Sequence, residues 1–161
     1  MTNKKIETAL FLAFSAFLLL IDWLSKRWAE TVLAAARTMP LINGVIGLRY
    51  AENTGAAFSA FSGATMLLSA FSAVVCIAVL IYFLKHPEMD ILSKLSFSMI
   101  FAGGVGNLID RITLGYVVDF FELQFMDFAI FNVADVCITV GAALLFIALL
   151  RGGEGHARME N

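Results

Sequence analysis

Residues 64–84 read ATMLLSAFSAVVCIAVLIYFL and contain no charged side chain. A run of about 20 mostly apolar residues is the length at which an α-helix crosses the hydrocarbon core of a bilayer. The segment therefore predicts a transmembrane helix, and similar segments elsewhere in the chain decide how many times it crosses.

Three further apolar segments lie at residues 7–26, 95–114 and 130–150. Hydrocarbon offers no partner to backbone N–H and C=O groups, so each segment must be helical unless it is a barrel strand, and none has a strand's alternating polarity. Residues 7–26 follow two lysines, as a signal peptide would, but no small-residue cleavage site closes the run, and we expect it to be retained. The sequence thus predicts an all-α membrane protein with four transmembrane helices, forming one domain over residues 1–161.

Composition agrees with this class. The 161 residues are 60% hydrophobic and only 15% charged, and the mean hydropathy is +0.86. Soluble domains are about 45–50% apolar and about 25% charged, which excludes an ordinary water-soluble fold. The net charge of −2 and the lack of a basic stripe argue against a nucleic-acid partner. Cys76 and Cys137 lie in apolar runs without CxxC spacing, so we expect two small buried hydrophobes.

The linkers predict a small structured region on one side of the membrane. Residues 28–37 are rich in alanine and are a possible interfacial helix between the first two spans. The Asn43-Gly44 pair marks a turn, and residues 45–52 alternate in polarity as a short strand or hairpin does. Residues 113–129 are rich in valine and phenylalanine and are expected to be half-immersed. We therefore expect a small β or irregular extracytoplasmic region.

The polar residues in and beside the spans gather near one membrane face. A charge in a membrane segment is costly, so such residues usually have a partner or a function. In an up-down bundle the ends of spans one and three and the starts of spans two and four share one side, and the candidate residues there are Asp22, Asn53, Asn107, Asp110, Arg111, Asp119, Asn132 and Asp135. The middles of the spans are almost entirely apolar. A small carboxylate-based ion or proton transporter is the alternative, but it would need polar groups at mid-span. A scaffold without chemistry is a third interpretation.

Carboxylates dominate this cluster. Neither histidine nor cysteine lies among them, so we expect neither a metal nor a cofactor. A magnesium site held by oxygen ligands is the alternative that stays open. Two carboxyl groups in a poorly solvated site share a proton, so that one acts as base and the other as acid. Asp22 has Lys26 at i,i+4 and Asp110 has Arg111 beside it, which indicates charge pairing for these two. Asp119 has no cation nearby in the sequence, and Asp135 precedes fifteen uncharged residues, 136–150. Spacing alone does not prove an aspartic pair.

Four segments, in order, resemble motifs of the lipoprotein signal peptidases, also called signal peptidase II. Residues 53–58 read NTGAAF, residues 103–111 read GGVGNLIDR, residues 117–120 read VVDF and residues 131–135 read FNVAD. The resemblance covers nearly the whole chain, from about residue 22 to about residue 141.

The resemblance implies an aspartic endopeptidase of the bacterial inner, or plasma, membrane. Asp119 and Asp135 would be catalytic, and the other six polar residues of the cluster would bind substrate or shape the site. The implied substrate is a prolipoprotein whose cysteine already carries diacylglycerol, cut just before that cysteine. Globomycin is the implied inhibitor, membrane lipid surrounds the site, and we expect a monomer.

Charge distribution gives a weak prediction of topology. On the side opposite the site lie Lys4, Lys5, Lys85, Lys94, Arg151 and Arg158, and on the site's own side lie Lys26, Arg27, Arg37, Arg49 and Arg111. Six cations against five slightly favour the positive-inside rule. We therefore expect both termini in the cytoplasm and the active site at the outer face.

Overall fold

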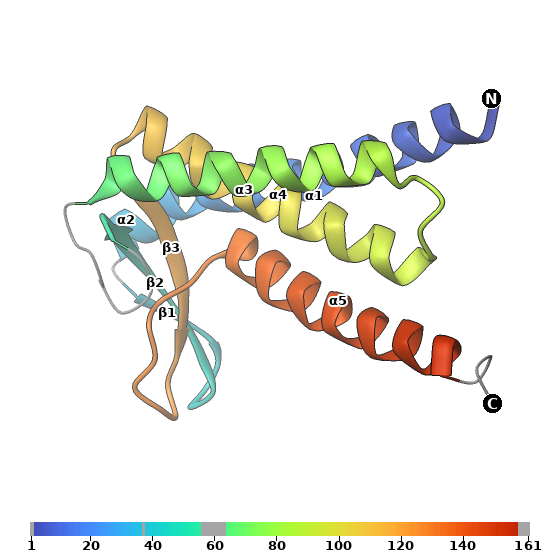
Figure 1. Cartoon of the computed structure of the whole chain (residues 1–161). Coiled ribbons are helices and arrows are strands. Elements are labelled where there is room, and N and C mark those ends of the chain that lie inside the picture. Colours follow the sequence, from blue (N-terminus) through green and yellow to red (C-terminus); the bar gives the residue numbers. More distant parts are fainter. Residues whose placement is uncertain (1, 37, 56–63, 158–161) are drawn as a thin grey trace.

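The computed structural model of the chain describes residues 2–36, 38–55 and 64–157. Within these residues four long helices run roughly side by side, α1 (Thr2–Trp28), α3 (Thr65–Lys85), α4 (Ile91–Thr113) and α5 (Val133–Ala157). Each is long and apolar enough to cross a membrane. A three-stranded sheet stands across one end of the helices, here called the sheet end, and the start of α1 and the end of α5 lie at the other (Figure 1). The predicted fold class is confirmed.

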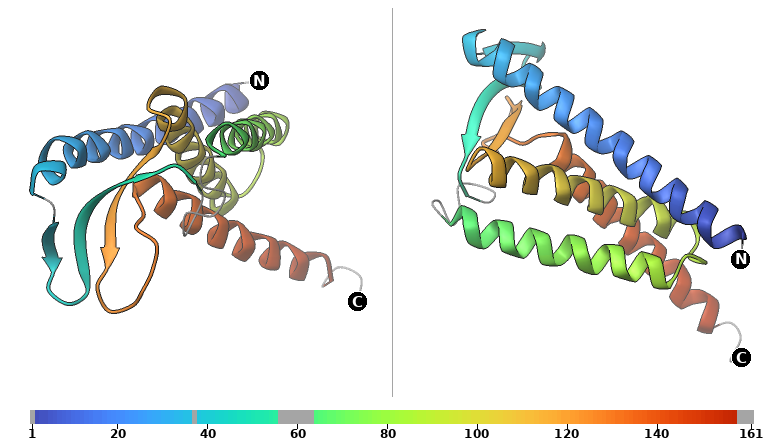
Figure 2. Two further views of the ribbon diagram at one scale, coloured as in Figure 1. Left: turned by 90° about the vertical axis from the view of Figure 1, so that its left-hand side faces the viewer. Right: turned by 90° about the horizontal axis from the view of Figure 1, so that it is seen from above.

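Helix α4 lies at the centre of the bundle. It packs against α1, α3 and α5, and α5 also contacts α1 (Figure 2). Two glycines make the close approach of α4 and α5 possible. A Cβ at Gly103 would collide with the carbonyl oxygen of Ala134, and one at Gly141 would lie 2.9 Å from the carbonyl oxygen of Ser96. The small-residue run of α4 therefore serves helix packing, as small residues do in membrane bundles.

Apolar side chains cover the outside of the bundle as well as its inside. The exposed large hydrophobic residues include Leu10 and Phe17 on α1, Phe71 on α3, Ile109 and Ile112 on α4, and Phe146 on α5. Inside, Phe11 of α1 stacks on Phe83 of α3 with ring centroids 3.9 Å apart. Outward-facing apolar surface on every long helix is what contact with lipid chains requires, and the protein is a multi-pass membrane protein.

Several helix boundaries differ from the sequence prediction, since α1 begins at Thr2 rather than at residue 7 and α5 covers Val133–Ala157 rather than residues 130–150. The interfacial helix expected at residues 28–37 does not separate from the first span, because α1 continues through a π-helical turn, η1 (Ala29–Leu33), into α2 (Ala34–Ala36). Helix α4 begins at Ile91, four residues before the predicted start at 95. Asp90 is its N-cap, accepting from the backbone N–H groups of Leu92 (2.9 Å) and Ser93 (3.2 Å).

The sheet has the order β1-β2-β3 and is antiparallel, with β1 (Thr38–Ile42), β2 (Ile46–Asn53) and β3 (Val117–Leu123). The predicted hairpin is confirmed, and Gly44 takes a φ of +73° in its turn, where a side chain would be strained. Strand β3 was not predicted, although its valines and phenylalanines favour a strand. It pairs with the distant β2, so that Asp119 lies opposite Ala51, 119 − 51 = 68 positions earlier in the chain.

One face of the sheet is held against the end of the first helix. Ala29 and Leu33 of η1 are fully buried against Leu48, Val118 and Phe120. Because successive side chains of a strand point to opposite faces, Asp119 lies on the other side of β3 from its neighbours Val118 and Phe120. This packing fixes the position of Asp119 relative to the ends of the helices. Residues 56–58 of the first motif and the charges at Arg37 and Arg158 lie outside the described residues.

Candidate active site

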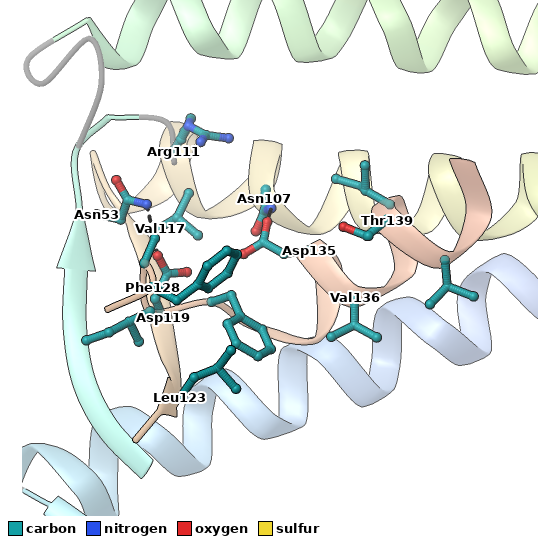
Figure 3. Close-up of a pocket in the computed structure, with 15 residues that line it drawn as sticks. Asn53, Asn107, Arg111, Val117, Asp119, Leu123, Phe128, Asp135, Val136 and Thr139 are labelled. Atoms are coloured by element: carbon teal, nitrogen blue, oxygen red, sulfur yellow. Dashed lines mark hydrogen bonds between the residues drawn. The ribbon is translucent and has the colours of Figure 1, made fainter. Parts of the chain in front are cut away.

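The two carboxyl groups without a cation neighbour in the sequence line one cavity at the sheet end. Asp119 comes from β3 and Asp135 from the first turn of α5, and the cavity has a volume of about 440 Å³. In Figure 3 both side chains point into it, with Asn53, Asn107 and Arg111 on its rim. Five of the predicted site residues therefore meet in one cavity although they come from β2, α4, β3 and α5.

Asp135 is held by the start of α5. The side-chain oxygen of Asn132 accepts from the backbone N–H of Asp135 (2.9 Å), and Asp135 Oδ2 accepts from the backbone N–H of Asn132 (3.2 Å). This is a reciprocal capping box with Asn132 at the N-cap. The position also stabilises negative charge, since a carboxylate in the first turn of a helix lies at the positive end of its dipole. The start of α5 therefore fixes the orientation of the Asp135 carboxyl group toward the cavity.

Asp119 has a different environment. Only 2% of the residue is exposed, and its oxygens accept from Asn53 Nδ2 (2.9 Å) and Asn132 Nδ2 (2.7 Å). Burial, followed by the negative charge of Asp135, raises the pKa of Asp119 from 3.8 to about 7. The two amide donors and the more distant Lys26 oppose this rise without cancelling it. Asp119 is therefore the carboxyl group of the pair that holds a proton near neutral pH.

Behind the cavity lies a buried charge network centred on Lys26, which is 2% exposed. Its Nζ contacts Asp22 (2.9 Å), Asp110 (3.0 Å) and the side-chain oxygen of Asn107 (2.9 Å). The expected Asp22–Lys26 pair is confirmed. The expected pairing of Asp110 with Arg111 is wrong, because Asp110 faces α1 and has Lys26 as its ion-pair partner.

Asp22 and Asp110 also connect the helices to the segments that carry Asp135 and Asp119. Asp22 Oδ1 accepts from the backbone N–H of Ala134 (2.8 Å), and Asp110 Oδ2 accepts from that of Val118 (3.2 Å). Each carboxylate thus anchors the residue next to one of the cavity's aspartates. Both act from behind the cavity and do not line it, so their geometry is that of residues that shape a site.

Arg111 reaches the cavity from the last turns of α4. Its Nη2 donates to the carbonyl oxygen of Gly55 (3.2 Å), which ties α4 to the end of β2. Its Nε is buried and has no acceptor among the described residues. A buried donor of this kind is costly unless something binds it, so this edge of the cavity suits an oxygen of a bound molecule.

The rest of the cavity wall is mostly apolar. Along α5 it is lined by Val136, Ile138, Thr139 and Val140, while the end of β3 adds Leu123 and the following loop adds Phe128. Carboxyl, amide and guanidinium groups are therefore confined to the sheet end, and further along α5 the Thr139 hydroxyl is the one polar side-chain group among the lining residues (Figure 3). The described residues contain no cluster of three or more His, Cys, Asp or Glu side chains placed to hold a metal ion.

Comparison with known proteins agrees with this geometry. A sequence profile described as Signal peptidase (SPase) II matches residues 14–151. The chain belongs to the signal peptidase II family. A lipoprotein signal peptidase of Streptococcus pyogenes serotype M2 is 41% identical over 144 residues, which cover 89% of this chain and 95% of that protein. A relative of the same name from serotype M1 is 40% identical with the same coverage.

Two solved structures, both bacterial membrane enzymes studied by the in meso method, share the fold. One, at 2.3 Å resolution, has a TM-score of 0.84 and 28% identity and covers 91% of each chain. The other, at 1.9 Å resolution, has a TM-score of 0.79 and 29% identity over 88% of this chain and 93% of that one. Membership of the signal peptidase II family gives no support to the transporter interpretation.

Sequence reasoning missed one member of the site. Lys26 was paired with Asp22 and left out of the predicted site residues, whereas it also contacts Asp110 and Asn107. The signal was present, since a lysine four residues beyond an aspartate in an apolar helix is expected to be buried with more than one partner.

Proposed function

We propose that this chain is a bacterial membrane aspartic endopeptidase that removes signal peptides from prolipoproteins by cutting just before the diacylglyceryl-modified cysteine. The observation that carries the proposal is the placement of Asp119 and Asp135 on one cavity at the sheet end of the bundle. Family membership supports the reaction, and the environments of the two carboxyl groups support a division of roles between them.

In this proposal Asp135 is the base and Asp119 the acid. Asp135 takes a proton from a water molecule as the water oxygen attacks the scissile carbonyl carbon, and Asp119 gives its proton to the carbonyl oxygen. When the resulting gem-diol collapses, Asp119 recovers a proton from a hydroxyl group. The amide C–N bond breaks and the leaving amine of the cysteine takes the proton held by Asp135. The pair returns to its starting state with one proton.

The cavity supports a lipid-bearing substrate. Its polar end offers Arg111 Nε to a substrate oxygen. Its mostly apolar end runs along α5, a helix long and apolar enough to cross the membrane. Each buried CH₂ contributes roughly 0.8 kcal/mol to membrane affinity, so two acyl chains would hold the scissile bond at the leaflet of the carboxyl groups. Globomycin, a cyclic peptide, would occupy the same cavity as an inhibitor. One chain supplies every named group, which supports action as a monomer.

We further propose that the sheet end faces outward and both termini are cytoplasmic. Sheet edges are not tolerated in hydrocarbon, so the sheet lies in the interface at one side of the membrane. The opposite end carries Lys4, Lys5, Lys85, Lys94 and Arg151, the side that the positive-inside rule assigns to the cytoplasm. Reporter fusions after Asn161 and within residues 88–90 test this orientation, and an extracytoplasmic signal from either would overturn it.

A cleavage assay in detergent micelles tests the proposed function. A diacylglyceryl-modified peptide and the same peptide without lipid are incubated with the protein, and mass spectrometry locates the cut. The proposal expects cleavage directly before the modified cysteine and a strong preference for the lipidated peptide. Equal rates on the two peptides, or a cut elsewhere, would contradict it.

A further inference from the structure

Two asparagines at the site have their side-chain oxygens occupied by backbone N–H groups. Asn53 Oδ1 accepts from Gly55 (2.9 Å), and Asn132 Oδ1 accepts from Asp135 (2.9 Å). A side-chain amide has its acceptor at one end and its two donors at the other, so an occupied oxygen decides where the NH₂ group points. Both NH₂ groups consequently donate to Asp119.

Asn107 faces the other carboxyl group but has no such backbone donor. It lies within α4, where backbone N–H groups are used by the helix itself. Its Oδ1 is instead occupied by Lys26 Nζ (2.9 Å), with a longer contact from Asn132 Nδ2 (3.1 Å). Its NH₂ group donates to Asp135 Oδ1 at 2.8 Å.

The charge of Lys26 favours this orientation of the Asn107 amide over the flipped one. Turning the amide of Asn107 over would place its NH₂ group against the lysine ammonium and its oxygen against Asp135, so that both contacts became repulsive in a buried site. Without Lys26 only Asn132 would hold the oxygen, and the NH₂ group of Asn132 is shared with Asp119 and with the carbonyl of Val118.

We propose that Lys26 is a positioning residue, which holds the side-chain amide of Asn107 so that it donates to Asp135 and keeps that carboxylate in its basic form. The inference rests on the proposed function, in which Asp135 is the base. Asp22 and Asp110 hold the ammonium in place from the other side, and each is fixed by a backbone N–H.

Lys26→Met in the full-length protein tests this, because methionine is an unbranched apolar side chain, one atom shorter than lysine, and has no donor. We expect kcat to fall about 10²-fold, at the low end of what general acid–base catalysis contributes, with KM changed by less than threefold. The acid-side limb of the pH–kcat profile should move up by about one to two pH units, since loss of a donor disfavours the ionised base. The charged groups that bear on this limb are Asp119 on β3, Asp110 and Arg111 on α4, and Asp22 and Lys26 on α1.

Lys94→Met is the matched control. Lys94 of α4 contacts Glu7 of α1 at 2.7 Å, so it also forms an ion pair between these helices, but away from the sheet end. Its removal should leave kcat and the pH profile unchanged. A purely structural role for Lys26 would make the two variants alike in turnover per folded molecule.

A double-variant cycle with Asn107→Ala separates positioning from a direct role. If Lys26 acts through Asn107, adding Lys26→Met to Asn107→Ala should lower kcat by less than twofold. Independent, multiplying losses would overturn the proposal, as would an unshifted acid limb in Lys26→Met. If Lys26→Met does not fold, Asp22→Asn/Lys26→Met keeps the net charge of the network and takes its place in every assay. Failure of this variant to fold as well would overturn the proposal by making Lys26 a folding residue.

The proposed function is tested separately in the same assays. A Lys26→Met variant with the wild-type kcat beside inactive Asp119→Asn and Asp135→Asn would overturn the role of Lys26 alone. Active Asp119→Asn and Asp135→Asn would overturn the proposed function.

Discussion

The raised pKa of Asp119 makes a measurable prediction about stability. In the unfolded chain this carboxyl group ionises near pH 3.8, whereas in the folded protein it ionises near pH 7. Between these values the folded state holds a proton that the unfolded state has lost, so folding weakens steadily as the pH rises and the loss is complete above about pH 7. At 1.36 kcal/mol per pH unit the difference corresponds to about 4 kcal/mol at its largest.

Asp119→Asn should remove this dependence, because asparagine keeps the shape of the side chain and does not titrate. The substitution also changes the hydrogen bonds to Asn53 and Asn132, but that effect does not vary with pH. The expected result is therefore a difference in slope. The unfolding free energy of Asp119→Asn minus that of the wild type should rise by about 4 kcal/mol from pH 4 to pH 8. This change does not depend on the value of the difference at pH 4.

Thermal unfolding in one detergent at several pH values measures this slope. Asp127→Asn is the control, since Asp127 is an exposed carboxylate on the loop after β3 and does not line the cavity. It should follow the wild-type curve. If Asp119→Asn also runs parallel to wild type from pH 4 to pH 8, Asp119 is not held protonated by its environment and the division of roles proposed for the pair is refuted.

Three further outcomes are expected. Asp110→Asn should lower the unfolding free energy by about 3 kcal/mol and reduce activity, because it leaves Lys26 with a single carboxylate partner in a buried site; a stability equal to wild type would contradict this. Gly106→Ala should cost about 1–3 kcal/mol, measured by thermal unfolding, because its Cβ would lie 2.5 Å from Asp22 Oδ2 and force α1 and α4 apart; an unchanged melting temperature would argue against so close a contact. Cleavage should continue in the presence of a chelator, and activity that is lost with chelator and restored by a divalent ion would defeat a mechanism based on carboxyl groups alone.

The four spans and the gathering of polar residues at one end of the bundle could be predicted, because the bilayer imposes strong rules. Long uncharged runs must be helices, and costly polar residues at their ends must find partners. The hairpin around Gly44 was also predictable from its turn residues. Strand β3 was not, because a short run of valine and phenylalanine beside a membrane span is equally typical of an immersed linker, and its pairing with β2 is a long-range contact.

The residues of the site could be predicted more completely than the contacts between them. The i,i+4 spacing of Asp22 and Lys26 gave their pairing, and the i,i+3 spacing of Asn132 and Asp135 at the start of a helix is that of a capping box. The partner of Asp110 could not be read from its neighbour in the chain. Adjacent residues on a helix point in different directions, so Arg111 turns toward the cavity while Asp110 turns toward α1.

The most direct test of the account is turnover per folded molecule for Asp119→Asn and Asp135→Asn on the lipidated peptide, with Asp110→Asn beside them. Melting temperatures in the same detergent establish how much of each protein is folded. The account predicts that Asp119→Asn and Asp135→Asn are folded and cleave no peptide, while Asp110→Asn loses stability and activity together. A stable, inactive Asp110→Asn beside an Asp119→Asn that still cleaves would contradict it and place Asp110 in the catalytic pair.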